Sequence, residues 1–363
     1  MLILGIESSC DDMAAAVVRD GRYVLSNVVS SQDAIHKKYG GIVPELASRR
    51  HLETVIPVVE DALRQAKVTI DDIDVIGVTQ GPGLVGSILI GLSFAKAIAY
   101  VKDIPFVGVN HIVAHPMAVF LEERVRGQGS GVKGGKKEIL AVNLAPCPLP
   151  LAPDFPFIAL VVSGGHTTLF QFKDFGDYEI LGQTRDDAAG EAFDKVAKLL
   201  GLGYPGGGVI DRLAKTGNAS AIKFTRPYIS KDTFDFSFSG IKTAVLKYLK
   251  DNLTQGLSLE NSGMINDLSA SFQEAVVDVL TDKAVSVCQV NNVNNLVVCG
   301  GVACNSRLRE KLRERTEHNG IRLFIPEPGL CSDNGAMIAA GAEHLLKKGI
   351  RGSLDMNAIP SME

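Results

Sequence analysis

Apolar residues in the first third of the chain form short strand-like runs and two longer helical stripes. Continuous or alternating apolar residues predict strands at about residues 1–8, 14–19, 23–30, 74–78 and 106–109. A helix is expected over 44–66, where apolar side chains recur at helical spacing at Leu46, Leu52, Val55, Val59 and Leu63. A second apolar helix is expected over 85–101. This alternation of strands and helices indicates an α/β fold.

The second half of the chain repeats the order of the first. A strand expected at 157–162 runs into Ser163-Gly164-Gly165, and a further β-like run follows at 169–172. The N-terminus has the same arrangement, with an apolar run, a turn of small hydroxyl residues and a second run at 14–18. Two such units predict two related lobes around a cleft in which nucleotide phosphates would be held from both sides.

The predicted organisation has four parts. An N-terminal lobe is expected over 1–123 and a C-terminal lobe over 157–325, and residues 326–363 are expected to return to the N-terminal lobe. Residues 124–156 combine lysines and arginines with glycines and prolines. That composition is typical of an exposed basic insert or linker.

Length and composition indicate a globular protein with more than one core. The chain has 363 residues, of which 46% are hydrophobic and 21% charged, with 37 glycines and no tryptophan. A net charge of -4 argues against a protein whose whole surface binds nucleic acid. A local basic patch is compatible with this charge. No run approaches about 20 uninterrupted apolar residues and no signal peptide is evident, so we expect a cytoplasmic protein without a membrane span. The six cysteines are scattered, which predicts free buried thiols and a packing role for Cys299 and Cys304.

The two histidines in Val-Asn-His-Ile-Val-Ala-His, His111 and His115, follow the strand expected at 106–109. On a helix, this four-residue spacing places both imidazoles on one face, close enough to share a metal ion. Taken alone, such a pair is more often a partly buried helix face. Pro116 would clash with the preceding turn of a regular helix, so the helix is expected to be kinked here or to start later.

Three glycine-rich loops follow predicted strands or precede predicted helices. Ser163-Gly164-Gly165 can present backbone amides to an anion, although an ordinary hairpin turn has the same composition. The loop at 300–305 ends in Asn305, which would either reach a ligand or cap the following helix. The loop at 204–208 is followed by Asp211. Neither a Walker loop nor a Gly-x-Gly-x-x-Gly dinucleotide turn is present.

Carboxylates lie beside these loops. Asp11 and Asp12 follow the first turn, and a second group comprises Asp186, Asp187, Glu191 and Asp194. Asp186 and Asp187 are interpreted as residues that favour a helix N-terminus. Asp333 precedes a helix expected over 336–346 and is by itself best interpreted as its N-cap. Beside two histidines it would instead supply the oxygen ligand of an open metal site.

Nine motifs together resemble the TsaD family of tRNA threonylcarbamoyladenosine transferases, formerly called glycoproteases. In order along almost the whole chain, they are Gly-Ile-Glu-Ser-Ser-Cys-Asp-Asp (5–12), Gly-Gly-Ile-Val-Pro-Glu-Leu-Ala-Ser-Arg-Arg-His (40–51), Thr-Gln-Gly-Pro-Gly-Leu (79–84), Asn-His-Ile-Val-Ala-His (110–115), Val-Ser-Gly-Gly-His-Thr (162–167), Asp-Asp-Ala-Ala-Gly-Glu-Ala-Phe-Asp-Lys (186–195), Phe-Ser-Phe-Ser-Gly-Ile-Lys-Thr (236–243), Gly-Gly-Val-Ala-Cys-Asn (300–305) and Cys-Ser-Asp-Asn-Gly-Ala-Met-Ile-Ala (331–339). The motif at 236–243 resembles the form of this motif in the bacterial and organellar branch of the family.

The resemblance implies an actin-like ATPase fold with two RNase H-like lobes around a nucleotide cleft. It implies that His111, His115 and Asp333 hold one divalent metal, iron in the first place and zinc as the alternative. It further implies that threonylcarbamoyl-AMP is bound by nine residues: Val161, Val162, Ser163, Gly164, Gly165, Asp194, Gly207, Asp211 and Asn305. Asp11 would assist the attacking amine of the tRNA adenosine beside the anticodon. The implied partners are tRNA, a paralogue without the metal site (TsaB-like) and a small ATPase (TsaE-like).

Two features differ from the family pattern, and three other functions are alternatives. Position 12 is Asp where relatives usually carry Glu, and the segment 124–156 is longer than expected. A metalloprotease would need the glutamate of His-Glu-x-x-His, which is absent here. A small-molecule kinase of the same fold would hold magnesium through carboxylates and phosphates. A non-catalytic nucleotide-binding scaffold would keep nucleotide binding when His111 is replaced.

Overall fold

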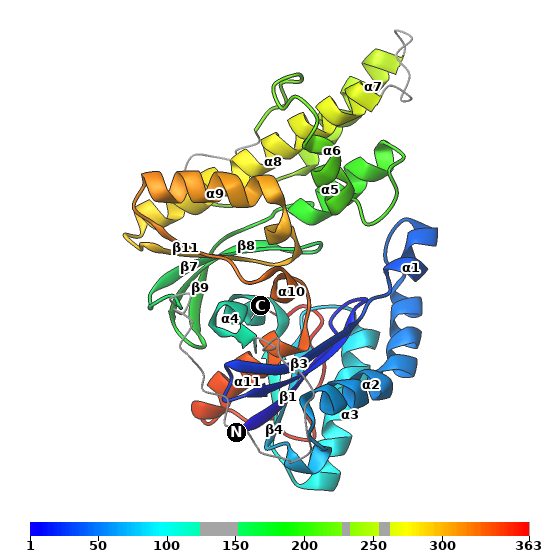
Figure 1. Ribbon diagram of the computed structural model, residues 1–363, viewed down its shortest axis with the longest axis vertical. Coiled ribbons are helices and arrows are strands. Elements are labelled where there is room, and N and C mark those ends of the chain that lie inside the picture. The colour runs from blue at the N-terminus through cyan, green and yellow to red at the C-terminus, as the bar shows by residue number, and fades with distance from the viewer. Residues whose placement is uncertain (124–151, 227–232, 254–261, 363) are drawn as a thin grey trace, which may run out of the picture.

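Two β-sheets form the frame of the molecule in the computed structural model, which describes residues 1–123, 152–226, 233–253 and 262–362 (Figure 1). The first sheet has the order β5-β4-β1-β2-β3-β6. Its strands are β1 (Leu2–Glu7), β2 (Met13–Arg19), β3 (Tyr23–Ser30), β4 (Val75–Gly81), β5 (Phe106–Asn110) and β6 (Glu122–Glu123). The second sheet has the order β11-β10-β7-β8-β9. Its strands are β7 (Phe157–Val162), β8 (Thr167–Asp174), β9 (Asp177–Gln183), β10 (Asn295–Cys299) and β11 (Arg322–Phe324).

The two sheets share one topology. In the first, β1 pairs antiparallel with β2 and parallel with β4, and β4 pairs parallel with β5. In the second, β7 pairs antiparallel with β8 and parallel with β10, and β10 pairs parallel with β11. The predicted repeat of an α/β unit is therefore confirmed.

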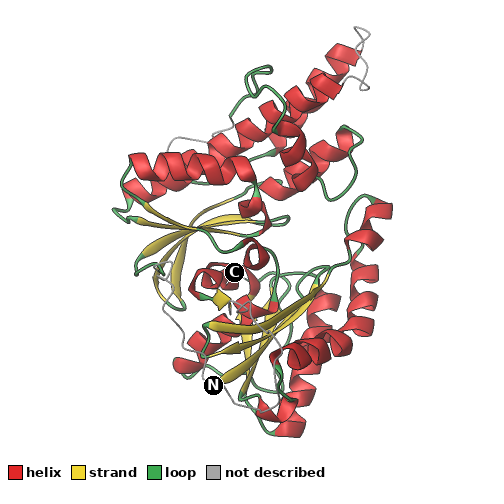
Figure 2. Cartoon of the chain, in the orientation of Figure 1, coloured by secondary structure: helices red, strands yellow, loops and turns green. Residues whose placement is uncertain are grey.

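Helices lie in three layers around the sheets (Figures 1 and 2). The outer face of the first sheet is covered by α2 (Pro44–Ala66) and α3 (Val85–Lys102). Between the sheets lie α4 (His111–Met117) and α11 (Gly335–Lys347). Beyond the second sheet lie α5 (Ala189–Leu199), α6 (Gly207–Ala214), α7 (Ser239–Leu253), α8 (Ser262–Val290) and α9 (Ser306–His318). Short elements are α1 (Asp33–His36), α10 (Pro328–Cys331) and the 3-10 turns η1 (Lys37–Tyr39), η2 (Ile70–Asp72), η3 (Ala118–Phe120) and η4 (Gly301–Cys304).

Strand β7 shows why the chain needs helices on both faces of this sheet. Ile158, Leu160 and Val162 pack with the outer helices, whereas Phe157, Ala159 and Val161 pack with the layer between the sheets. Alternate side chains of a strand point to opposite faces, so an all-apolar strand must be buried on both. Full burial of each large side chain contributes roughly 1.5–3 kcal/mol. This strand leads directly into the loop at 163–165.

The helix predicted over 44–66 has those bounds, but the assignment of one residue to its buried apolar face is wrong. Leu52 is 69% exposed. The buried side chains instead follow the stripe Ala47, His51, Thr54, Val55, Val58, Val59 and Ala62. Spacings of three and four residues keep that stripe on one face, and Leu52 lies off it. The apolar pattern therefore located the helix correctly while misplacing part of its face.

Helix α3 is long and apolar enough to cross a membrane by length and composition alone, and it is the one such helix among the described residues. A third of its apolar window is buried inside the protein. Leu92, Ala95 and Ala99 pack with the first sheet and α2. One such helix is weak evidence, because the core helix of a soluble protein passes the same test.

Within the described residues, the expectation of free buried thiols is confirmed for Cys288, Cys299 and Cys331, whereas the free thiol of Cys10 is only partly buried. Cys299 is buried as expected. The packing role expected for Cys304 is wrong, because that residue is exposed at the end of η4.

The C-terminal residues contact the first sheet. Helix α11 begins against β1, and a Cβ placed on Gly5 would lie 2.0 Å from the carbonyl oxygen of Gly335. Further along, the amide of Ile359 donates to the carbonyl of Gln80 at 2.8 Å. Most of the insert predicted over 124–156 lies outside the described residues, and the four-part division of the chain stays a prediction.

Candidate functional site

The histidine pair lies on the turn that follows β5. The side chain of Asn110 accepts hydrogen bonds from the amides of Ile112 and Val113, at 2.9 and 3.2 Å, and so caps α4. The helix therefore begins at His111 itself, and His115 follows one turn later. Of the two alternatives expected from Pro116, a later start of the helix is wrong, and a kink stays a prediction. The proline lies within α4, one residue before the helix gives way to a 3-10 turn.

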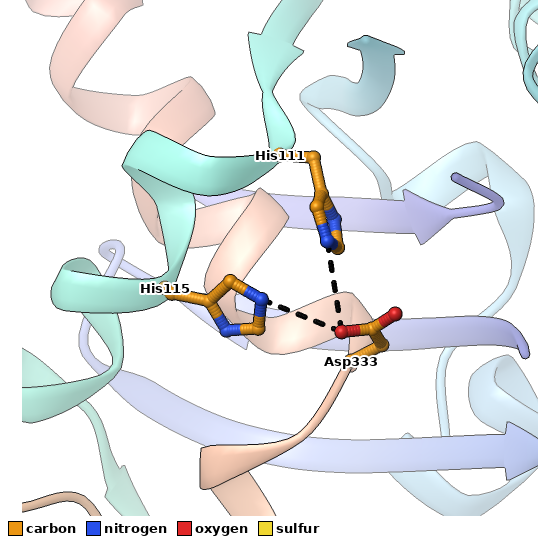
Figure 3. A group of neighbouring side chains, drawn as sticks. All are labelled: His111, His115 and Asp333. Carbon is orange, nitrogen blue, oxygen red and sulfur yellow. Dashed lines mark ion pairs between the residues drawn. The ribbon is translucent and has the colours of Figure 1, made fainter. Parts of the chain in front are cut away.

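Asp333 faces the two histidines from the loop between α10 and α11 (Figure 3). Its Oδ1 lies 3.6 Å from His111 Nε2 and 3.4 Å from His115 Nε2. The N-cap of α11 is Asn334, whose side chain accepts from the amide of Met337 at 2.9 Å. The interpretation of Asp333 as a helix cap is therefore wrong. Because its neighbour caps the helix, the Asp333 carboxylate is available to the histidines.

These three side chains fit a metal ion. One ligand atom of each lies within 4.8 Å of the others. In the described residues, this is the one group of three or more His, Cys, Asp or Glu side chains close enough to share a metal ion. Neither ring nitrogen of the buried His115 has a hydrogen-bond partner in the described part of the chain. A buried imidazole without a partner is costly, and a bound cation would satisfy it. Two imidazoles and one carboxylate are a donor set used by both zinc and non-haem iron.

Charge interactions tie this triad to a fourth residue, Glu7. Burial alone would lower the pKa of His111, but the carboxylates of Glu7 and Asp333 raise it to about 9. Burial would raise the pKa of Asp333, yet the histidines hold it well below its usual range. For His166, burial together with electrostatic interactions with His111 and His115 lowers the pKa to about 4. The site therefore concentrates opposite charges in a small buried volume.

The residues predicted to bind the adenylate gather at the end of the second sheet where β7 and β10 finish. Val161 and Val162 are fully buried in β7. The loop that follows them contacts α5, where the amide of Gly190 donates to the carbonyl of Ser163 at 3.2 Å. Next to it, a Cβ on Gly300 would lie 2.3 Å from the carbonyl oxygen of Val162. Two of the predicted glycine loops are therefore adjacent.

The polar members of that set have partners within the protein. Asp194 accepts from the amide of Gly206 at 2.7 Å, which fixes the N-terminus of α6. Asp211 accepts from the hydroxyl of Ser306 at 2.8 Å. Asn305 caps α9 through the amide of Leu308 at 3.0 Å. These side chains shape the site's backbone, and the capping alternative for Asn305 is confirmed.

Three groups with raised pKa values lie where the lobes face each other. Burial raises the pKa of Asp11. Burial, and then the charges of Asp11 and Asp333, raise that of Asp12 to about 7. Burial, followed by Asp11 and Asp194, raises that of Tyr204. Tyr204 and Asp194 belong to the second half of the chain, so these interactions relate the predicted catalytic residue to the predicted adenylate site.

Asp186 lies at a helix N-terminus as predicted, but the helix is a distant one. Its carboxylate accepts from the amides of Phe238 and Ser239, at 2.8 and 3.3 Å, at the start of α7. Asp187 instead bridges Lys195 and Lys242, each at 2.7 Å. The interpretation as a residue that favours a helix N-terminus is therefore confirmed for Asp186, whereas Asp187 forms ion pairs with two lysines instead.

A cavity of about 740 Å³ lies beside the triad. Its lining includes Asn110, His166, Arg185, Asp235 and Met362. None of the nine predicted adenylate residues is part of this lining. His166 links it to the candidate metal site, because it also interacts electrostatically with His111 and His115.

Sequence reasoning missed Glu7 and Tyr204. Glu7 is a carboxylate at the end of an otherwise apolar, buried strand, and that isolated charge is a signal the pattern did contain. Tyr204 had no comparable signal, because its neighbourhood depends on how the two lobes meet.

Two sheets of one topology, with a buried His-His-Asp group between them, define an actin-like ATPase fold that carries a candidate metal site. HypF in its phosphate- and nucleotide-bound form is similar, with a TM-score of 0.55, 15% identity, and coverage of 97% of this chain and 56% of that chain. Component A of Acidaminococcus fermentans (R)-2-hydroxyglutaryl-CoA dehydratase gives a TM-score of 0.50 at 16% identity, covering 96% of this chain and 98% of that one. At such identities the likeness shows the fold alone.

Sequence comparison identifies the particular family. Residues 23–147 and 140–340 match TsaD, described as tRNA N6-adenosine threonylcarbamoyltransferase. A protein of that name from Syntrophus aciditrophicus (strain SB) is 51% identical over 359 residues, 99% of this chain and 96% of its own length. One from Geotalea uraniireducens (strain Rf4) is 50% identical over 360 residues, 99% and 96% of the two chains. The chain belongs to the TsaD family.

Proposed function

We propose that this protein transfers threonylcarbamoyl from threonylcarbamoyl-AMP to the N6 amine of the adenosine next to the anticodon, in tRNAs that read ANN codons, and releases AMP. The observation that carries the proposal is the full-length identity of about half to relatives named for this transfer. The grouping of His111, His115 and Asp333 supports it independently, because neither a magnesium-dependent kinase nor a scaffold needs such a group.

The triad would hold one divalent ion, iron in the first place and zinc as the alternative. When bound, that ion would act as a Lewis acid that polarises and orients the mixed anhydride. The anhydride is already activated, so the protein does not have to generate a strong nucleophile. The residues of this chain are therefore needed mainly for binding and orientation.

The adenylate would lie against the adjacent loops at the ends of β7 and β10. The amides of Gly164 and Gly165 in Ser163-Gly164-Gly165 would be offered to the phosphate and its developing charge as AMP leaves. Val161 and Val162, which pair in β7 with β8 and β10, would position this loop. The remaining members of the proposed binding set act at two loops and a helix N-terminus: Asp194, Gly207, Asp211 and Asn305. Their hydrogen bonds within the protein give these loops a fixed shape before the substrate arrives.

Asp11 is the proposed catalytic residue. The adenosine amine attacks the carbonyl carbon of the threonylcarbamoyl group, and the bond from that carbon to the phosphate oxygen breaks, leaving the electron pair on AMP. The amine loses a proton in this step. Because burial raises the pKa of Asp11, its carboxylate is a stronger base than an exposed aspartate and is suited to take that proton. An anticodon base can be splayed from its loop to reach it.

We further propose a cytoplasmic location and two helper proteins, a TsaB-like paralogue and a TsaE-like ATPase. These proposals rest on the family resemblance. The prediction of a solvated loop for the lysines and arginines of 124–156, with contact to tRNA phosphates as the alternative, falls mostly outside the described residues and stays a prediction.

The test is transfer of labelled threonylcarbamoyl to an unmodified tRNA that decodes ANN codons. Purified protein receives synthase-made adenylate and active helper proteins. His111→Ala is compared with His318→Ala, which removes an exposed histidine at the end of α9. We expect label on the tRNA with wild type and the control, and its loss with folded His111→Ala. No transfer by metal-loaded wild type would overturn the proposal in favour of a kinase or a scaffold.

A further inference from the structure

Glu7 is a fully buried carboxylate at the end of β1 that contacts one of the three candidate metal ligands. Its Oε2 lies 2.9 Å from Nδ1 of His111. The same oxygen accepts from the hydroxyl of Thr79 at 2.7 Å, and Oε1 accepts from the amide of Ser9 at 2.5 Å. Strand β1 lies parallel to β4, and β4 to β5, so the ends of all three strands meet at this edge.

The contact with Glu7 determines which nitrogen of the neutral His111 ring carries the proton. An ionised carboxylate only accepts hydrogen bonds, so Nδ1 must be the protonated nitrogen that donates to it. In the neutral ring, Nε2 then presents a lone pair. Nε2 is the atom that faces Asp333, at 3.6 Å.

We propose that Glu7 is a positioning residue for the metal site: it holds His111 in the Nδ1–H tautomer, with the ring turned so that Nε2 faces the shared ion. The inference rests on the proposed function only in so far as that function requires a metal. A carboxylate that accepts the outer N–H of a ligating histidine also raises the basicity of the ligand. Loss of such a partner typically lowers metal affinity about 10–100-fold.

His115 provides an internal contrast. Its two ring nitrogens have no hydrogen-bond partner in the described residues, whereas Nδ1 of His111 has Glu7. Of the two imidazoles, only that of His111 therefore has its tautomer set by a described carboxylate. The affinity of the site should depend strongly on this one contact.

The acceptor-only character of Glu7 makes glutamine an informative substitution. All three neighbours donate to Glu7, and two of them share Oε2. Glutamine has one carbonyl oxygen and one NH2 group, so its NH2 must face either Ser9 N–H or the His111–Thr79 pair. If it faces His111, the ring reverses its tautomer and places a proton on Nε2. If it faces Ser9, a buried amide loses its acceptor, and His111 donates to a neutral oxygen. In either orientation His111 loses the negative charge that raises its basicity as a ligand.

The experiment is a titration of metal-free protein with Zn²⁺ against a chromophoric chelator. Glu7→Gln is compared with Glu343→Gln, a matched change at a buried glutamate of α11 that pairs with Lys347. We expect Glu7→Gln to weaken Zn²⁺ binding about 10–100-fold and Glu343→Gln to change it less than twofold. Urea unfolding of the metal-free proteins shows whether both variants are folded.

A second readout follows the proton itself. In Zn²⁺-loaded wild type, one slowly exchanging ring N–H of a histidine should be visible by NMR, absent in His111→Ala and lost or shifted in Glu7→Gln. Unchanged Zn²⁺ affinity in folded Glu7→Gln, or no Zn²⁺ binding by wild type, would overturn the inference. Tight binding that depends on Glu7, without transfer to tRNA, would instead overturn the proposed function and leave this inference standing.

Discussion

Gly300 should be one of the most sensitive positions of the adenylate loops. It joins β10 to η4 with φ of 91° and ψ of 163°, a conformation that is essentially limited to glycine. An added Cβ would lie 2.3 Å from the carbonyl oxygen and 2.7 Å from the carbonyl carbon of Val162. These are backbone atoms of a fully buried strand, which cannot move aside as a flexible side chain would.

The two costs of Gly300→Ala can be added. A residue held in that backbone region costs about 1–3 kcal/mol. Overpacking against a rigid neighbour costs about 1–3 kcal/mol more. We therefore expect the free energy of unfolding to fall by about 2–6 kcal/mol in urea denaturation followed by far-UV circular dichroism. Where the variant folds, adenylate affinity should fall as well, because the displaced strand end leads into Ser163-Gly164-Gly165.

The adjacent glycine provides the control. Gly301 is exposed, and a Cβ there would meet nothing within 4 Å. Gly301→Ala should change the free energy of unfolding by less than about 0.5 kcal/mol. If Gly300→Ala were no less stable than Gly301→Ala, the close approach of the two loops, and the reasoning built on it, would be refuted.

Three further predictions concern the metal, a helix cap and pH. With free Zn²⁺ at a hundred times its Kd, calorimetry should show that the free energy of unfolding of wild type is about 2.7 kcal/mol higher than that of chelator-treated protein. His115→Ala should show no such increase. Asn305→Ala should lower the free energy of unfolding in urea by about 1–2 kcal/mol through loss of the α9 cap, whereas Asn305→Asp, which keeps the acceptor, should lose less. Burial lowers the pKa of His51 to about 4. The stability contributed by the neutral ring is therefore complete above about pH 6.5 and is lost as the pH falls toward 4. The free energy of unfolding should fall from pH 7 to pH 5 by about 2 kcal/mol less in His51→Gln than in wild type.

The periodic parts of the fold could be predicted from the sequence, because they depend on local patterns. The helix at 44–66 was located to the residue, and the run at 157–162 was correctly assigned as a strand. The helix ends were less predictable. Asp333 and Asn334 are both good capping residues, and which of them caps α11 depends on what the other one contacts.

The candidate site depended on longer-range geometry. The four-residue spacing of His111 and His115 indicated a shared face, but no spacing relates either residue to Asp333, more than 200 positions later. The resemblance to a family supplied that link, and the distances of 3.4 and 3.6 Å are consistent with it. Glu7 had no such link and emerged only from its contact with His111.

Strand polarity accounts for the position of both groups of residues. In an α/β sheet, ligand sites form where parallel strands end, because the connecting loops begin at that edge. Glu7, Thr79 and Asn110 lie at the ends of the parallel strands β1, β4 and β5, and His111 follows directly. In the second sheet, the loops at 163–165 and 300–305 follow the parallel strands β7 and β10. Each edge thus supplies one half of the proposed site. The loop before α11, which packs between the sheets, adds Asp333 to the first half.

A change that shifts α11 against β1, such as a larger residue at Gly5 or Gly335, should therefore disturb the proposed metal site before it disturbs the proposed adenylate loops.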